Sequence, residues 1–352
     1  MKIIQVIPFF GLGGAETMCE NLIYELKAVG HQILALSLYE KETPITQRLT
    51  EAGVELRYLH KKEGLDFSLY GKLRKIFKEE HPDVVHTHLY TTKYVFPVAA
   101  AMGIKVVHTV HSIAVQEASS LSRKFNGFFF KRGKAVPVAL SENIRQTIVE
   151  VYPLTEEQIP VVLNGIDLSK CTPKESYAPA DPFRIVHVGS YQEVKNHFGM
   201  LGAFAQFHKK YPNTQLHLIG DGPRRGLIED FAREKGIVDC VVFYGFQSNV
   251  YSFLPGMDVF TLPSLYEGIP MSIAEAMGTG LPVVATRVGG IPDMLDDESA
   301  LLVPVDVDAI AAAYEKYYLD ESLRAQHGRA ALGRSVRFSA KTMAQDYVRI
   351  YQ

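Results

Sequence analysis

Hydrophobic and polar residues follow one another along this chain in two alternating patterns. Short apolar runs of strand length are each followed by a longer segment in which apolar residues recur every three or four positions, as they do on one face of a helix. Met18, Leu22 and Leu26 form one such helical series, which comes after an apolar run that begins at Lys2. Buried strands that alternate with amphipathic helices predict open parallel sheets covered by helices on both faces.

The pattern occurs in two series, and a polar segment rich in proline separates them. In the first series we predict strands near residues 2–9, 31–38, 54–59, 83–87, 105–110 and 135–140. In the second we predict strands near residues 184–189, 214–219, 240–244, 258–262, 282–286 and 301–303. The segment between them, roughly 164–183, contains Pro173, Pro179 and Pro182 and resembles a linker.

Chain length supports the same division. At 352 residues the chain is longer than one hydrophobic core usually serves. We therefore predict two Rossmann-like α/β domains, each with a doubly wound parallel sheet, over residues 1–165 and 166–338. A last helix is predicted over 339–352; it can pack on either domain, including back on the first.

Composition excludes several classes of protein. Hydrophobic residues make up 47% and charged residues 22% of the chain, as in ordinary globular proteins. A net charge of -2 provides no overall attraction to nucleic acid, so no nucleic-acid partner is expected. Cys19, Cys171 and Cys240 are odd in number and far apart, which favours a reducing compartment over a disulfide framework or a zinc site. We expect a cytoplasmic protein with neither a signal peptide nor a membrane span.

A glycine-rich turn follows the first predicted strand and reads Gly11-Leu12-Gly13-Gly14-Ala15-Glu16. Glycines at the start of a helix allow a ligand to approach the backbone and direct free amides at an anion. A dinucleotide fingerprint needs glycine or alanine where Glu16 stands, and no ribose-binding acid is evident after the second strand, so a dehydrogenase is disfavoured. The alternative is a tight strand-to-helix turn without a ligand.

The strongest signal is the segment from Pro263 to Met277, directly after a predicted strand. It places Glu267 on a loop and Glu275 in the helix that begins near Pro270. The start of that helix offers backbone amides at which a diphosphate is favourably held. One acid can then reach a sugar while the other reaches the far side of the same nucleotide. The alternative is a solvated loop acid and an exposed helix acid.

Together these motifs resemble glycosyltransferase family 4, whose members are retaining enzymes of the two-domain GT-B architecture, and the resemblance covers essentially the whole chain. Besides the glycine turn and the paired glutamates, its features are Asp83-Val84-Val85-His86-Thr87-His88, His108-Thr109-Val110-His111, Ser141-Glu142, Asn164-Gly165-Ile166-Asp167, Val188-Gly189 with Lys195, and Gly220-Asp221-Gly222. The resemblance implies a deep cleft between two Rossmann-like domains, with the acceptor site mostly in the first and the donor site mostly in the second.

The resemblance also implies roles for individual residues. Glu267, His111 and Lys195 would be catalytic: Lys195 would neutralise the donor diphosphate, Glu267 would lie beside the transferred sugar, and His111 would bond a sugar hydroxyl. The donor would contact Gly14, Ser190, Lys195, Phe246, Gly268, Ile269, Met271 and Glu275, with Glu275 on the ribose. Two departures concern this set. The family commonly has arginine where Ser190 stands, and Pro270 has no N–H to donate.

The expected reaction expels a nucleoside diphosphate, so its main demand is to stabilise negative charge on the leaving oxygen. A lysine and a helix start meet that demand without a metal. The paired acids Asp306 and Asp308 are better explained as the cap of a helix. His86 and His88 share one strand face, but no third ligand is evident, which favours buried or cleft-lining histidines over a metal pair. We expect no metal and no cofactor, with a UDP- or GDP-sugar as substrate.

Basic and aromatic residues gather between Arg123 and Lys134. They predict either peripheral contact with an anionic membrane or a helix with Phe125, Phe128 and Phe129 in the core and a solvated basic face. The expected partners are a nucleotide-sugar donor and a saccharide or lipid-linked acceptor of surface polysaccharide or glycolipid assembly. Two alternatives stay open: a UDP-sugar 2-epimerase of the same fold, and a nucleotide-sugar-binding subunit without turnover.

Overall fold

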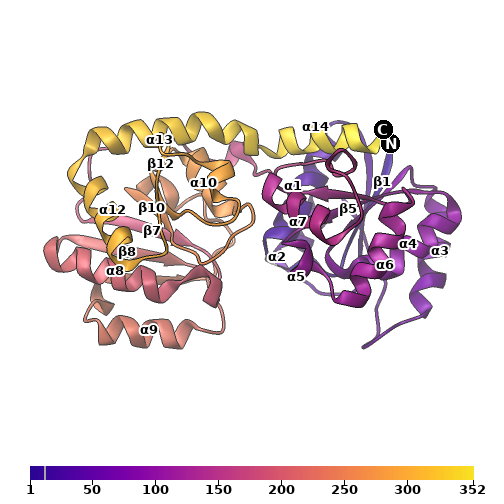
Figure 1. Cartoon of the computed structure of the whole chain (residues 1–352), viewed down its shortest axis with the longest axis horizontal. Coiled ribbons are helices and arrows are strands. Elements are labelled where there is room, and N and C mark those ends of the chain that lie inside the picture. The colour runs from indigo at the N-terminus through magenta and orange to yellow at the C-terminus, as the bar shows by residue number, and fades with distance from the viewer. Residues whose placement is uncertain (12) are drawn as a thin grey trace. The chain divides into compact units, whose positions relative to one another are not determined.

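The protein consists of two compact units, which a computed structural model describes over residues 1–11 and 13–352 (Figure 1). Unit 1 comprises Met1–Gly165 and Ser339–Gln352, and unit 2 comprises Ile166–Phe338. Leu12, in the predicted glycine-rich turn, lies outside the described residues.

Unit 1 is built around a parallel six-stranded sheet in the order β3-β2-β1-β4-β5-β6. Its strands are β1 (Lys2–Ile7), β2 (Gln32–Ser37), β3 (Glu55–Tyr58), β4 (Val84–His88), β5 (Lys105–Val110) and β6 (Val136–Ala139). Its helices are α1 (Gly14–Ala28), α2 (Pro44–Glu51), α3 (Ser68–Glu80), α4 (Thr92–Met102), α5 (Ala114–Glu117), α6 (Ser120–Lys131), α7 (Glu142–Val151) and α14 (Ala340–Tyr351), with short 3-10 turns η1 (Leu89–Thr91) and η2 (Glu156–Gln158).

Unit 2 repeats this plan with the order β12-β11-β10-β7-β8-β9. Its strands are β7 (Phe183–Val188), β8 (Thr214–Ile219), β9 (Val241–Gly245), β10 (Val259–Leu262), β11 (Val283–Thr286) and β12 (Ala300–Val303). Its helices are α8 (His197–Lys210), α9 (Arg225–Glu234), α10 (Met271–Thr279), α11 (Ile291–Met294), α12 (Val307–Leu319) and α13 (Glu321–Ser335), and its 3-10 turns are η3 (Leu168–Lys170), η4 (Glu193–Lys195), η5 (Val238–Cys240), η6 (Leu254–Gly256) and η7 (Val336–Phe338).

Burial explains why these segments form layers. In β1 every residue from Ile3 to Ile7 is buried, and the helical series Met18, Leu22 and Leu26 of α1 is completely buried against the sheet. Continuous burial of a strand on both faces requires helices on both sides, which is the α/β arrangement that the alternating pattern predicts. The predicted fold of two Rossmann-like domains is confirmed, and each predicted strand is present.

The C-terminal helix α14 belongs to unit 1, where it packs against α1 (Figure 1). Its last turn brings the Tyr351 hydroxyl within 2.7 Å of His86 Nδ1 and within 3.4 Å of Gln5 Nε2. The two termini of the chain therefore lie close together, because Gln5 is in β1 and Tyr351 is the last residue of α14.

The two sheets share one topology, in which the strand order reverses beside the first strand. That reversal lies between β1 and β4 in unit 1 and between β7 and β10 in unit 2. Loops that leave the carboxyl ends of such a strand pair diverge to opposite faces and form the crevice in which open α/β sheets bind ligands. The residues after β1, β4, β7 and β10 are therefore the first candidates for a site.

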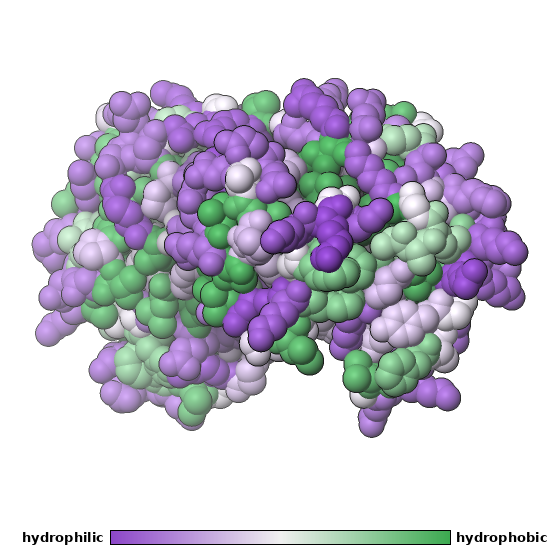
Figure 2. Space-filling model, turned by 45° about the vertical axis from the view of Figure 1, so that its right-hand side comes forward, coloured by the Kyte–Doolittle hydropathy of each residue, from purple (hydrophilic) through white to green (hydrophobic). Residues whose placement is uncertain are grey.

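Apolar residues on the face drawn in Figure 2 are interspersed among hydrophilic ones. Within the described residues, the structure contains no helix with the length and apolar character needed to span a bilayer.

Candidate active site

Two loops at the strand reversal of unit 2 bring three polar side chains together. Lys195 ends the turn that follows β7, whereas Ser264 and Glu267 lie between β10 and α10. The Lys195 ammonium donates to Glu267 Oε1 at 2.6 Å, and the Ser264 hydroxyl donates to the same oxygen at 2.6 Å. The Glu267 side chain is 9% exposed and that of Lys195 is 17% exposed. Glu267 is thus a shielded, paired carboxylate and not a solvated loop acid.

Close backbone packing holds the Glu267 loop. The segment after β11 crosses it so tightly that a Cβ on Gly289 would lie 1.8 Å from the Glu267 carbonyl oxygen, and Gly289 has φ +53°. The Gly290 amide donates to that same carbonyl at 3.2 Å, and Thr286 Oγ1 donates to the Ser264 carbonyl at 2.5 Å. Only glycine fits such a crossing at positive φ, so residues far along the chain position Glu267.

The loop after β7 is held in the same way. Gly220 has φ +138°, and a Cβ there would lie 2.0 Å from the Gly189 carbonyl oxygen. The Tyr191 amide donates to the Asp221 carbonyl at 2.9 Å. Gly189 and the Gly220-Asp221-Gly222 turn therefore form one packed backbone unit, beside which Ser190 is exposed.

Glu275 lies in the second turn of α10 and is 9% exposed. Burial raises the pKa of its carboxyl to about 8, although a hydrogen bond with the Tyr251 hydroxyl acts in the opposite direction. Cys171 packs close by, with its sulfur 2.6 Å from the Cβ position of Gly278. The alternative of an exposed helix acid is therefore wrong, because the α10 face that carries Glu275 is covered by the chain around Cys171 and Tyr251.

The remaining donor residues expected in unit 2 differ in exposure. Helix α10 begins at Met271, one residue later than predicted, with Pro270 as its N-cap. Ile269 is buried, Gly268 and Met271 are half-buried, and Phe246 is 46% exposed at the end of β9. Gly268, Ile269 and Met271 are thus next to the Glu267 loop along the chain, whereas Phe246 comes from a different strand.

The two arginines after the Gly220-Asp221-Gly222 turn have acidic partners of their own. Arg224 pairs with Glu193 at 3.2 Å, and Arg225 pairs with Asp221 at 3.1 Å and with Glu229 at 2.8 Å. Helix α9 begins at Arg225, with Arg224 as its N-cap. Lys195 is paired with a residue of the Glu267 loop, and neither arginine is.

Three buried side chains lie next to the Lys195 turn with few hydrogen bonds. His187 bonds the Thr261 carbonyl through Nδ1 at 3.0 Å, but its Nε2 has no partner among the described residues. The same holds for both ring nitrogens of His197 and for the Tyr191 hydroxyl. Burial lowers the pKa of His187 to about 4 and that of His197 further below its usual value, so both rings are neutral.

In unit 1, His111 directly follows β5 and is half-buried. Its Nε2 lies 3.0 Å from Nδ1 of His88, the last residue of β4. Burial, with a smaller contribution from His108, lowers the pKa of His111 to about 3. His111 and His88 are therefore neutral partners at the carboxyl end of the sheet.

His86 and His88 are both fully buried and bonded within unit 1. His86 Nδ1 meets the Tyr351 hydroxyl at 2.7 Å and its Nε2 meets Thr109 Oγ1 at 2.8 Å, while His88 Nε2 meets Gln5 Oε1 at 2.9 Å. Each ring nitrogen of the pair thus has a protein partner. Among residues 1–11 and 13–352, no group of three or more histidine, cysteine or acidic side chains is arranged to hold a metal ion.

The glycine-rich turn of unit 1 contains its own anion. Gly13 is the N-cap of α1 and Gly14 its first residue. The Glu16 carboxylate turns back over them and accepts hydrogen bonds from the Gly13 and Glu16 backbone N–H groups, while burial raises its pKa. In this structure two amides of the turn are thus occupied by Glu16, a contact that the sequence motif did not predict.

Glu117 has a buried side chain, and no motif in the sequence indicated it as a site residue. It accepts backbone hydrogen bonds from His111 and Ser112, and burial raises its pKa to about 7. Its Oε1 lies 3.9 Å from His108 Nε2. Ser264 and Tyr251 were not predicted as site residues either. Only the Ser-x-x-Glu spacing of Ser264 and Glu267, typical of serine–carboxylate contacts across a turn, was a usable signal.

The basic stretch 123–134 forms most of α6. Phe129 and Phe130 are buried and Phe125 is half-buried, but Phe128 is 51% exposed and stacks on the Arg132 guanidinium at 3.7 Å. The prediction that Phe128 lies in the core is wrong, because Phe130 occupies the next inward position. The expected helix cap at Asp306 is confirmed, since its carboxylate accepts from the Ala309 amide at 2.8 Å.

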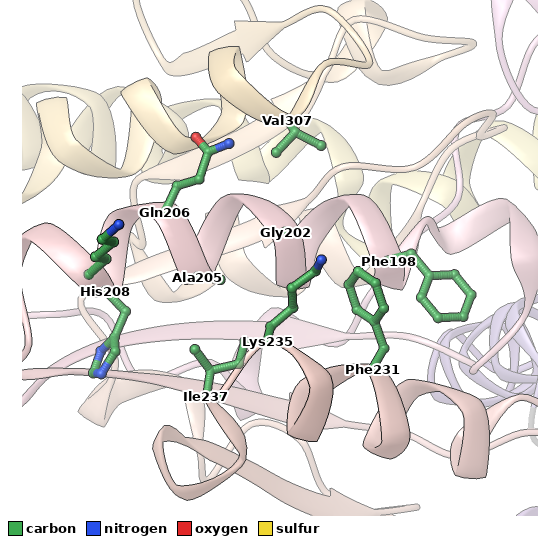
Figure 3. A pocket seen from close by; sticks show the side chains of 11 residues that line it. Phe198, Gly202, Ala205, Gln206, His208, Phe231, Lys235, Ile237 and Val307 are labelled. Carbon is green, nitrogen blue, oxygen red and sulfur yellow. The ribbon is translucent and has the colours of Figure 1, made fainter.

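A separate apolar groove lies on unit 2 between α8 and α9 (Figure 3). Phe198 and Phe231 meet edge to face across it, and Gly202 and Ala205 form its floor. It contains none of the predicted site residues, so it is not the candidate active site.

Two family models match the chain: "Glycosyltransferase Family 4" over residues 12–170 and "Glycosyl transferases group 1" over residues 172–334. A putative glycosyltransferase, EpsF, of Bacillus subtilis is 27% identical over 301 residues, which cover 80% of this chain and 78% of EpsF. The UDP-Gal:alpha-D-GlcNAc-diphosphoundecaprenol alpha-1,3-galactosyltransferase of Escherichia coli is 27% identical over 271 residues, 71% of this chain and 70% of its own.

Solved structures share the fold. Anabaena HepE in complex with UDP superposes with a TM-score of 0.85 at 19% identity and covers 99% of each chain. A glycosyltransferase from Rickettsia africae gives a TM-score of 0.84 at 18% identity, over 99% of this chain and 97% of its own.

Proposed function

The chain belongs to the glycosyltransferases of family 4 and group 1, and from this premise we propose which reaction it performs. It transfers a sugar from a nucleoside-diphosphate sugar to a saccharide or lipid-linked acceptor, and the product keeps the anomeric configuration of the donor. One observation carries the proposal: the shielded Lys195–Glu267–Ser264 cluster at the strand reversal of unit 2.

Lys195 supplies the charge that the leaving group needs. Its ammonium is held by Glu267 at 2.6 Å, and we propose that it donates to a diphosphate bound beside that loop. The first amides of α10 add partial positive charge at the same loop. In the transition state negative charge grows on the bridging phosphate oxygen, and donors fixed beforehand stabilise that charge without reorganisation.

Glu267 and Glu275 serve opposite ends of the donor. Glu267 is beside Lys195 and therefore close to the phosphate-linked sugar. Glu275 lies in the second turn of α10, is bonded to Tyr251, and binds the ribose hydroxyls. A UDP-sugar is the proposed donor, because the structurally similar HepE was solved with UDP and with UDP-glucose.

We propose retention because the family that the sequence resembles retains the donor configuration, and we propose a route without double displacement because no second acid is at hand. No other carboxylate among the described residues is hydrogen-bonded to the Lys195–Glu267–Ser264 cluster. We propose that the acceptor oxygen attacks the face that the diphosphate leaves. The acceptor hydroxyl then passes its proton to the departing phosphate oxygen as the new glycosidic bond forms.

Acceptor and location belong to the same proposal. The E. coli relative is named for a diphosphoundecaprenol-linked acceptor, which supports a lipid-linked acceptor here. Leu121, Lys124, Phe128 and Lys131 are exposed on α6 at helical spacing, and no acid occurs in that helix. We propose that this surface rests on anionic lipid at the cytoplasmic face of the membrane.

A donor screen tests the reaction. UDP-glucose, UDP-galactose, UDP-N-acetylglucosamine and GDP-mannose are each incubated with undecaprenyl-diphosphate-linked sugars, and the products are analysed by mass spectrometry and proton NMR. We expect an α-linked product from an α-linked donor. A β-linked product contradicts retention, and an epimerised free sugar formed without acceptor supports the epimerase alternative.

Two matched substitutions test the division of labour. Glu267→Gln should lower kcat by ~30-fold with little change in KM, because the contact of Glu267 with the sugar is stronger in the transition state than in the bound substrate. Glu275→Gln should raise the donor KM by ~10-fold with little change in kcat. Glu229→Gln on the neighbouring α9 is the control and should leave both constants unchanged. Equal effects of the two site variants on kcat contradict the assignment.

Membrane contact is tested with vesicles of neutral phosphatidylcholine with and without phosphatidylglycerol. We expect the protein to sediment only with the anionic vesicles, and the Lys124→Glu/Lys131→Glu variant to stay in solution. Equal binding of wild type and variant would reject the α6 surface as the docking site.

A further inference from the structure

Behind His111, three buried side chains of unit 1 continue a line of hydrogen bonds. His111 Nε2 lies 3.0 Å from His88 Nδ1, and His88 Nε2 lies 2.9 Å from Gln5 Oε1. The Gln5 amide nitrogen donates to the Tyr351 hydroxyl at 3.4 Å. The line thus starts at α14, passes through β1 and β4, and ends at the residue after β5.

Each member of this line has a defined donor and acceptor. The Gln5 carbonyl oxygen only accepts, so His88 carries its proton on Nε2. Burial holds the pKa of His88 well below its usual value, and a neutral ring protonated at Nε2 has a lone pair on Nδ1. His111 must then donate to that lone pair from its own Nε2. Because the His111 ring is neutral too, its Nδ1 carries no proton.

We infer that Gln5 and His88 are positioning residues that hold His111 in one tautomer, so that its Nδ1 accepts a hydrogen bond from a hydroxyl of a sugar substrate. The inference rests on the proposed function, since it takes a sugar substrate of that transfer as the group that His111 contacts. It adds a direction to that contact: the sugar hydroxyl donates and the imidazole accepts.

Neighbouring titratable groups do not compete for His88 Nδ1. His86, whose ring lies 4.3 Å from that of His88, is bonded to Tyr351 and Thr109. His108 of β5 is bonded through Nδ1 to Thr87. Which ring nitrogens carry protons therefore depends on the Gln5 amide. Its carbonyl oxygen can only accept a hydrogen bond and its nitrogen can only donate one.

The ring protonation is measured directly on the intact protein. Long-range proton–nitrogen NMR of protein labelled with ¹⁵N-histidine distinguishes protonated from bare ring nitrogens, with His88 and His111 assigned through His88→Gln and His111→Gln variants. We expect Nε2–H with bare Nδ1 in both rings. A proton on Nδ1 of His111 overturns the inference whatever the activity of the enzyme.

A double-mutant cycle tests whether His88 acts through His111. The donor found active in the screen above is used with its acceptor, and kcat/KM is measured for His88→Ala, His111→Ala and the double variant. We expect His111→Ala to lose ~30-fold, His88→Ala ~10-fold, and the double variant no more than His111→Ala alone. Equal losses from His88→Ala in both backgrounds reject the positioning role. An unchanged His111→Ala rejects the proposed sugar contact instead.

The Gln5→Glu variant is designed to change which ring nitrogens of His88 and His111 carry protons. A carboxylate beside His88 Nε2 raises the pKa of that ring, and the resulting imidazolium donates from both nitrogens. His111 must then accept at Nε2 and carry its proton on Nδ1. We expect kcat/KM of this variant to be ~10-fold below wild type at low pH and to recover at high pH. The wild type should not show this rise of kcat/KM with pH. His86→Gln, which is off the line, is the control and should keep the wild-type pH profile.

A pH profile of Gln5→Glu identical to that of wild type contradicts the inference, provided that circular dichroism shows the variant folded. Should Gln5→Glu not fold, Gln5→Met takes its place. Methionine has no amide oxygen to accept from His88 Nε2, so the direction of the hydrogen bonds is no longer fixed. We then expect NMR to show both tautomers of His111. A single Nε2–H tautomer in Gln5→Met would show that Gln5 does not set the proton order.

Discussion

The strand reversals of the two units have the same topology but opposite chemistry. In unit 2 the loops after β7 and β10 meet through a charged pair, Lys195 and Glu267, 2.6 Å apart. In unit 1, at the same end of the sheet, His88 at the end of β4 lies 3.0 Å from His111, which follows β5, and both histidines are neutral. The sheet thus determines where side chains converge, and the few residues beyond the strand ends determine what they bind.

The difference extends to the buried groups behind each reversal. In unit 1, His86 and His88 use all four ring nitrogens in bonds to Gln5, Thr109, Tyr351 and His111. In unit 2, His197 uses neither ring nitrogen among the described residues. Unit 1 therefore contains a completed polar network, while the polar groups behind Lys195 contribute little to stability by themselves.

The largest expected effect comes from removing the charge in unit 2. Lys195→Ala should reduce kcat/KM by ~100-fold, or about 3 kcal/mol, because a fixed donor to the developing charge is lost. Steady-state kinetics measure it. Lys209→Ala on α8 is the control for loss of one lysine and should behave as wild type. An unchanged kcat/KM in Lys195→Ala would remove the charged pair from the mechanism.

Stability tests the contrast between the two histidine groups. His86→Leu leaves the hydroxyls of Tyr351 and Thr109 without their partner and should lower the free energy of unfolding by about 2 kcal/mol. His197→Leu loses no hydrogen bond and should change it by less than about 1 kcal/mol in either direction. Urea unfolding of both variants without ligand provides the values. Equal losses would mean that the two groups are equally bonded.

Buried acids with a strongly raised pKa occur in both units: Glu117, about 7, in unit 1 and Glu275, about 8, in unit 2. When the pKa of an acid is raised in the folded state, the folded protein keeps a proton that the unfolded chain releases above about pH 4.5. The free energy of unfolding therefore falls as pH rises from that value up to the folded-state pKa. Glu275→Gln should therefore gain stability over wild type by roughly 2 kcal/mol between pH 6 and pH 8.

The stability gain of Glu117→Gln should level off about one pH unit below that of Glu275→Gln, because burial raises the pKa of Glu117 less than that of Glu275. Thermal unfolding at several pH values measures both variants, and Glu157→Gln, an exposed acid of η2, is the control. A gain that shrinks as pH rises would contradict the buried, protonated state of either acid.

The smallest expected effect is that of chelation. Lys195 and the α10 amides already supply positive charge, so we expect EDTA to leave turnover unchanged within error. Loss of activity with EDTA and its return with magnesium or manganese would show that unit 2 needs a metal to balance the diphosphate.

Local sequence features predicted much of the fold. The apolar runs mark β1 through β12 because strands buried on both faces tolerate few polar residues. Asp306 was identifiable as a helix cap from its position alone. Phe128 was misassigned because three consecutive phenylalanines offer two inward choices at helical spacing, and packing against Phe96 selects Phe129 and Phe130.

By itself, the sequence determined where the candidate residues stand along the elements: Lys195, Glu267 and His111 come after recognisable strands, and Glu275 lies within a recognisable helix. Only the tertiary structure decided what those residues contact. The Glu267–Lys195 and Gln5–His88 bonds join residues 72 and 83 positions apart, and Tyr351 reaches His86 from the other end of the chain. Contacts at such separations depend on how strands pair and helices dock, and no local pattern of residues encodes that packing.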